Sequence, residues 1–195
     1  MSTLMDMYPY ALFLHIVGAL GLFVTLGLEW AGMSNLRRAA TAEQAREWFK
    51  LLASLRRLYP IVWLTILIPG FYMAALVWRG LAWITIALAA IVVLVVLGMI
   101  LGRRRMASIV RAIAAESGRL SSVLRQQLND PVLWASLWIR TAISLGIVFL
   151  MAVKPGMLGS LLTMSVAILL GVAFSLPAWN RGREQLQTRQ AGDSL

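Results

Sequence analysis

The chain has 195 residues, of which 60% are hydrophobic and 13% are charged, and it contains no cysteine. A soluble domain has about 25% charged residues, so the composition argues against one, and the lack of cysteine excludes disulfides, zinc–thiolate sites and thiol catalysis within the chain. The net charge of +10 does not indicate a nucleic-acid-binding protein, because the basic residues lie between long apolar runs, where membrane topology places them.

The first predicted membrane span covers residues 8–33. This run is too long for the core of a signal peptide, and the segment before it carries Asp6 in place of basic residues, so we expect a retained helix. Seven of its residues alternate in spacings of four and three and therefore share one helix face: Ala11, His15, Gly18, Leu22, Thr25, Glu29 and Gly32. Because polar groups are costly in hydrocarbon, we expect this face to point into a helix bundle.

Two further spans form a predicted hairpin. Segment 41–58 is basic and carries an apolar stripe, which predicts a helix leading into the second span, 59–78. Pro69-Gly70 in the middle of that span predict a kink. The third span, 81–102, follows after a turn so short that the two spans must lie antiparallel.

Residues 103–128 form a second basic segment with apolar residues at helical spacing. These residues are Met106, Ile109, Val110, Ile113, Leu120, Val123, Leu124 and Leu128. The pattern predicts an amphipathic helix, with a break at Gly118, that lies at the headgroup boundary of the membrane.

The fourth and fifth spans cover residues 136–154 and 156–177, and a polar cytoplasmic tail follows over 181–195. Each of the five predicted spans has roughly 19–26 residues, against about 20 needed to cross the hydrocarbon core of a bilayer. The predicted fold is an all-α integral membrane protein, in which residues 1–180 form a single five-span helical bundle with cytoplasmic amphipathic helices.

The basic residues predict the orientation of the bundle. Segment 31–57 holds six of the eighteen, segment 103–135 another six and the tail three, so fifteen lie on one side of the predicted membrane. Basic loops face the cytoplasm, which places the N-terminus outside and the C-terminus inside a bacterial cytoplasmic (inner) membrane. We expect lipid around the bundle and anionic lipids at its cytoplasmic face.

His15 is the only histidine, and it lies in the outer half of the first span. An intramembrane histidine is a candidate axial ligand of haem, a candidate copper ligand or a proton-transfer group. The alternative is a neutral imidazole that is hydrogen-bonded to a neighbouring helix. A single histidine needs a second ligand, from a methionine or from His15 of a second copy in a homodimer, and thioether sulfur suits both Cu(I) and haem iron.

The predicted site for haem b or copper therefore combines His15 with a gap in the packing and with methionines of the outer half. Its residues are His15, Gly18, Met73, Met151 and Met164. Glu29 and Arg140 fall at similar depth near the cytoplasmic boundary and are predicted to form an ion pair, which lowers the cost of holding either charge in the membrane.

A resemblance supports the role of His15. The stretch Leu14-His15-Ile16-Val17-Gly18-Ala19 resembles the opening helix of small bacterial copper-resistance-D-like membrane proteins and of related uncharacterised families with four to five spans. Pro69-Gly70-Phe71 is similar to an element in the second helix of the same group. The resemblance implies a helical bundle with a histidine near the outer side and a link to copper handling or haem binding, and it assigns that role to His15.

Three functions stay open at this stage. The first is a membrane protein that binds haem b or a soft metal ion through His15 near the periplasmic side. The second is a non-catalytic accessory or structural subunit of a larger membrane complex, which the small size and tight hairpins favour. The third is a small-solute transporter or channel, which the few polar intramembrane residues and the lack of internal repeats disfavour. Nothing in the sequence resembles a catalytic triad, a paired-carboxylate site or a P-loop, so the sequence leans away from an enzyme.

Overall fold

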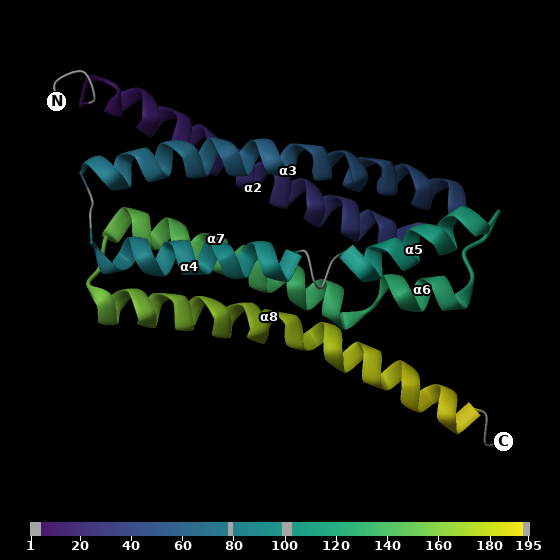
Figure 1. Ribbon diagram of the computed structural model, residues 1–195. Helices are drawn as coiled ribbons and strands as arrows, with labels where there is room; N and C mark the ends of the chain where they lie inside the picture. The colour runs from purple at the N-terminus through teal and green to yellow at the C-terminus, as the bar shows by residue number, and fades with distance from the viewer. Residues whose placement is uncertain (1–4, 78–79, 99–102, 193–195) are drawn as a thin grey trace.

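The structure, a computed structural model, describes residues 5–77, 80–98 and 103–192, and describes side chains for 5–77, 80–98 and 106–177. Its elements over these ranges are helices (Figure 1), with one isolated backbone bridge between Thr41 and Arg119. The predicted all-α class is confirmed.

The first two helices form a long hairpin. Helix α2 (Tyr8–Arg38) extends beyond the predicted end at residue 33, and α3 (Ala42–Leu76) joins the predicted segments 41–58 and 59–78 into one helix that contains Pro60 and Pro69. The Thr41 hydroxyl caps α3 by accepting a hydrogen bond from the backbone N–H of Gln44, while the Gln44 side chain accepts one from the N–H of Ala40. This reciprocal pair satisfies donors at the start of the helix and fixes the turn of the hairpin.

Helix α4 (Ala82–Leu97) corresponds to the third predicted span, 81–102. Its 16 residues fall short of the about 20 that cross a bilayer, and residues 99–102 lie outside the described part of the chain.

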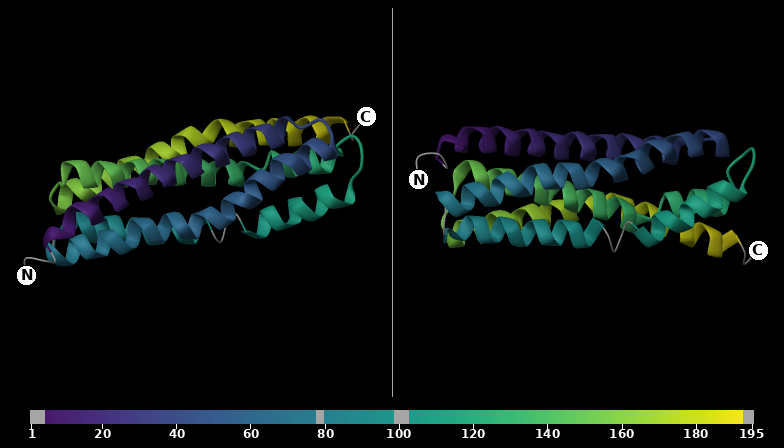
Figure 2. Two further views of the ribbon diagram at one scale, coloured as in Figure 1. Left: turned by 90° about the horizontal axis from the view of Figure 1, so that it is seen from above. Right: turned by 45° about the horizontal axis from the view of Figure 1, so that its top comes forward.

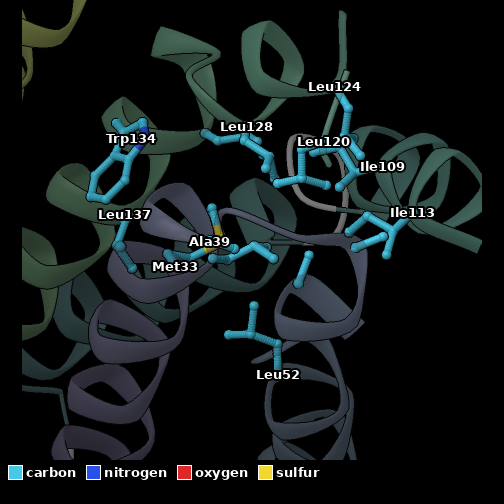
Figure 3. Packing of buried hydrophobic residues seen from close by; sticks show 14 of the residues in the cluster. Met33, Ala39, Leu52, Ile109, Ile113, Leu120, Leu124, Leu128, Trp134 and Leu137 are labelled. Carbon is cyan, nitrogen blue, oxygen red and sulfur yellow. The ribbon is translucent and has the colours of Figure 1, made fainter. Parts of the chain in front are cut away.

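The second basic segment folds into α5 (Arg103–Ala115) and α6 (Ser122–Leu128). The predicted break at Gly118 is confirmed, because Gly118 has φ +75°, a left-handed conformation that favours glycine. The position predicted for the segment, at the headgroup boundary, stays a prediction. Five of its eight apolar side chains pack with residues at the ends of α2, α3 and α7 (Figure 3), where they are buried: Ile109, Ile113, Leu120, Leu124 and Leu128.

Helices α7 (Pro131–Val153) and α8 (Met157–Gly192) form a second hairpin. Helix α7 begins five residues before the predicted start because the Asp130 carboxylate caps it by accepting a hydrogen bond from the N–H of Val132 at 2.9 Å and Pro131 suits the first helical turn. Helix α8 continues through Pro177 to Gly192, so the segment predicted as a polar tail is helical over most of its length.

Four helices are long and apolar enough to cross a membrane, over Tyr8–Arg38, Ala42–Leu76, Ser122–Val153 and Met157–Pro177. Many large apolar side chains on their outer faces are exposed, as is usual for a lipid-facing surface; Phe13 is 69% exposed and Leu158 72% exposed. These features indicate a multi-pass membrane protein. The predicted inward face of the first span is confirmed, since Gly18, Thr25 and Gly32 are buried.

The helices are arranged as two units. Helix α2 packs along α3, and α7 packs along α8 with α4 beside both (Figures 1 and 2). We call these units the α2–α3 pair and the α4–α7–α8 group. We call the end of the bundle at which α2 begins the proximal end, and the end covered by α5 and α6 the distal end (Figure 1).

Candidate ligand site at the proximal end

His15 is held by α3. Its Nδ1 lies 2.8 Å from the backbone carbonyl oxygen of Ile66. A carbonyl oxygen only accepts hydrogen bonds, so Nδ1 carries the proton and donates. In the neutral imidazole, Nε2 then keeps its lone pair and is available to bind a metal or to accept a proton.

Two glycines let the imidazole reach α3. A Cβ atom on Gly70 would lie 3.2 Å from Nδ1 of His15, and a Cβ on Gly18 would lie 2.9 Å from the carbonyl carbon of Thr65. Gly18 therefore brings α2 against the backbone of α3, and Gly70 makes room for the ring. The two sequence elements 14–19 and 69–71 are therefore in mutual contact, through His15 and Gly70.

His15 lines a cavity of about 190 Å³ between the two units at the proximal end. Met73 of α3 and Met151 of α7 line the same cavity, so the structure brings together three of the five predicted site residues. Most of the remaining wall is apolar; Tyr8 and Trp83 add polar atoms at its proximal side.

The other two predicted residues lie elsewhere. Gly18 does not line the cavity, because the space left by its missing side chain is taken by Thr65 and Ile66 of α3. Met164 is 8% exposed and packs within the α4–α7–α8 group, where its sulfur would lie 3.1 Å from a Cβ on Gly146. The sequence shows that both residues lie in the proximal half but does not show which neighbour each one meets.

Lys154 also lines the cavity, although no pattern in the sequence predicts it as a site residue. It follows α7 directly and is the described non-glycine residue with a positive φ, 52°. A left-handed conformation costs a residue with a Cβ about 1–2 kcal/mol, and glycine or asparagine is the usual choice at this position. A lysine here adds one basic residue to the cavity wall.

Glu29 and Arg140 lie toward the distal end, where the structure joins them in an ion pair. The hydroxyl of Tyr59 donates a hydrogen bond to the same Glu29 carboxylate. The side chains of Glu29 and Arg140 are 22% and 14% exposed, so the network is largely shielded from the surroundings. Tyr59 was not predicted, because a tyrosine at the start of a span is also the common membrane-interface residue.

The aromatic residues next to this network continue the link between the units. The indole N–H of Trp30 donates to the hydroxyl of Thr141 at 3.0 Å, and the rings of Trp30 and Trp138 meet edge to face with centroids 4.7 Å apart. Helix α2 is therefore bonded to α7 at two successive positions, Glu29 and Trp30.

Within the described residues, no group of three or more histidine, cysteine, aspartate or glutamate side chains could hold a metal ion. A metal at His15 would instead need thioether ligands. Comparisons with family models, with curated proteins and with solved structures found no match for this chain. The resemblance of residues 14–19 and 69–71 to copper-resistance-D-like proteins therefore stays a prediction.

Proposed function

We propose that this protein binds a soft monovalent metal ion, of which Cu(I) is the physiological example, in the proximal cavity. His15 supplies a nitrogen ligand, and Met73 and Met151 supply thioether sulfur. The proposal includes the predicted setting: a five-span bundle in a bacterial cytoplasmic membrane, with α4 as the fifth span and the proximal end facing the periplasm.

The hydrogen bond from His15 to Ile66 is the observation that carries the proposal. A histidine that binds a metal through one ring nitrogen almost always donates the other N–H to a carboxylate, a backbone carbonyl or water. That second bond fixes the tautomer and the orientation of the ring. His15 has this arrangement, with Nδ1 bonded to a buried backbone carbonyl and its ring in the wall of a cavity that two methionines share.

The ligand set favours a soft monovalent ion. Thioether ligands select Cu(I) over harder divalent ions. When bound, the ion would be held by neutral ligands in a mainly apolar site.

Haem b is the less favoured ligand at the same residue. Pockets for drug-sized ligands occupy about 300–1,000 Å³, whereas this cavity measures about 190 Å³. A porphyrin would require the two units to move apart. The predicted gap at Gly18 does not help, because α3 fills it.

Metal titration of the purified protein tests the proposal. Ag(I), a soft monovalent ion that does not change oxidation state, is added in competition with a chromogenic chelator, and Cu(I) is then tested under anaerobic conditions. We expect one equivalent to bind. The His15→Asn variant should bind at least tenfold more weakly, because the asparagine amide can still donate to Ile66 while Nε2 is lost.

Methionine variants provide the matched controls. Met73→Leu and Met151→Leu should each weaken binding, whereas Met164→Leu, at a buried methionine outside the cavity, should not. Methionine-to-leucine changes nearly preserve volume and have small effects on folding. Binding that is equal in all four variants and the parent would refute the proposal, and a Soret band in protein made with ample haem would assign haem b in place of the ion.

A further inference from the structure

We infer that the proximal cavity has a single entrance, at the proximal end, and that the Glu29–Tyr59–Arg140 network is part of a permanent seal below it. The protein would then take up and release its ligand on one side of the membrane and would not carry it across. This inference concerns access to the cavity, so it does not depend on the identity of the ligand.

Exposure along the cavity wall shows where the cavity opens. Lys154, which follows α7 at the proximal end, is an exposed residue of the wall. Three wall residues farther along the helices are buried, with Ile66 at 5%, Ala87 at 3% and Ile91 at 8% exposed. The cavity therefore opens proximally and is closed at its inner end.

A buried apolar layer follows directly below this inner end. Leu94 of α4 and Ile143 of α7 are 5% and 1% exposed and pack in one cluster of the α4–α7–α8 group. From the opposite unit, Trp63 and Leu67 of α3 pack against this cluster. Packed cores leave few voids larger than a water molecule, so this layer gives a hydrated ion no path.

The ionic network forms the next barrier and joins the two units. Glu29 comes from α2, Tyr59 from α3 and Arg140 from α7. A Cβ on Gly98 would lie 3.6 Å from Nη1 of Arg140, so the guanidinium also approaches α4. Removing one partner of a buried ion pair strongly destabilises a protein, because the other charge is left uncompensated.

The distal end is closed by a third barrier, the cluster around α5 and α6. Leu36 of α2, Leu55 of α3 and Leu137 of α7 are at most 2% exposed within it. Backbone hydrogen bonds also join the α2–α3 turn to the α5–α6 turn, from Ala42 N–H to the Gly118 carbonyl at 2.8 Å and from Leu120 N–H to the Ala40 carbonyl at 3.3 Å. Opening the cavity at the distal end would require all three barriers to break. We therefore assign the network to a fixed seal and not to a moving gate.

Cysteine accessibility tests the inference, and the natural chain has no cysteine to interfere. Ala74→Cys places one thiol in the cavity wall. Two exposed positions report the sides of the membrane: Met157→Cys at the start of α8 and Glu47→Cys in α3 beyond the network. Each variant is reconstituted into vesicles and treated with a small membrane-impermeant methanethiosulfonate from one side at a time, and labelling is read by mass spectrometry.

We expect Ala74→Cys to react only from the side that labels Met157→Cys, at a rate at least tenfold above that from the other side. Adding Arg140→Gln to Ala74→Cys should leave labelling from the Glu47 side absent, because the apolar layer and the distal cluster still close the path, and proximal labelling should persist. Labelling of this double variant from the Glu47 side would overturn the seal of three barriers. Labelling of Ala74→Cys from the Glu47 side in the parent background would overturn the single entrance, and so would a lack of labelling from both sides. No metal is used in this labelling experiment, so a result against the single entrance would not bear on the metal-binding proposal, which the metal titration tests separately.

Discussion

Gly18 is the position at which one added methyl group has the clearest expected consequence. A Cβ there would lie 2.8 Å from Cγ1 of Ile66, 2.9 Å from the carbonyl carbon of Thr65 and 3.0 Å from the backbone nitrogen of Ile66. Carbon atoms in good contact lie about 3.5–4.0 Å apart. Two of the three neighbours are main-chain atoms, so a change of rotamer cannot relieve the overlap, and Gly18→Ala must push α2 and α3 apart by roughly half an ångström.

The expected loss of stability in Gly18→Ala follows from this overlap and from a matched control. Overpacking of a close contact costs about 1–3 kcal/mol, while alanine gains up to about 1 kcal/mol over glycine in a helix. Gly27 lies on the same helix and has no atom within 4 Å of an added Cβ. Gly27→Ala should therefore show only the stabilisation from the higher helix propensity of alanine. The stability of Gly18→Ala should therefore fall about 1–3 kcal/mol below that of Gly27→Ala.

Unfolding in mixed micelles, by titration with dodecyl sulfate and followed by far-ultraviolet circular dichroism, measures this difference. Because α3 is displaced at Ile66, the acceptor of the His15 hydrogen bond, Gly18→Ala should also weaken Ag(I) binding, whereas Gly27→Ala should not. Equal stability of the two variants would refute the close approach of α2 and α3 at this position.

Three further predictions follow from other parts of the chain. Removing one partner of the ion pair, in Arg140→Met or Glu29→Gln, should cost about 3–5 kcal/mol, and the double variant should lose less than the two single losses added together; simple additivity in this double-mutant cycle would show that the two residues are not coupled. At Glu116, the side-chain and backbone hydrogen bonds from Ser121 lower the pKa of the carboxyl group, so the stabilisation is present above the ordinary glutamate range and is lost as the pH falls through the lowered pKa; Glu116→Gln should flatten this part of the stability profile, and an unchanged profile would contradict the role of the Ser121 hydrogen bonds. Reporter fusions after Arg57, Gln127 and Leu195 should be cytoplasmic and fusions at Gly80 and Gly156 periplasmic, and a periplasmic C-terminus would contradict the predicted orientation.

Hydrophobic runs and helical spacing predicted most of the fold. The inward face of α2 followed from seven residues at alternating spacings, because polar and small residues have no stable place among lipid tails. The same pattern in residues 103–128 predicted the helices and the break at Gly118 but not the helix ends against which they pack. An apolar stripe indicates that a helix face avoids water, but it does not indicate whether lipid or protein covers that face. The packing of Ile109 and Leu124 against α2 and α3 depends on the fold.

The candidate site was predicted in part for a similar reason. His15 stands out as the only histidine, and depth in the membrane placed Met73 and Met151 near it. Depth does not fix the direction of a side chain around a helix, so Met164 was grouped with them although it faces the core of the α4–α7–α8 group. Lys154 was missed because its role depends on the path of the chain at the end of α7, which hydropathy does not describe.

X-ray absorption at the copper edge of the Cu(I)-loaded protein tests most directly whether His15, Met73 and Met151 bind one ion together. We expect one nitrogen and two sulfur neighbours in the parent protein, one sulfur fewer in Met73→Leu and in Met151→Leu, and loss of the nitrogen neighbour in His15→Asn. The Met164→Leu spectrum should match that of the parent. A copper site without sulfur neighbours, or one whose spectrum is unchanged in His15→Asn, would contradict the proposed site.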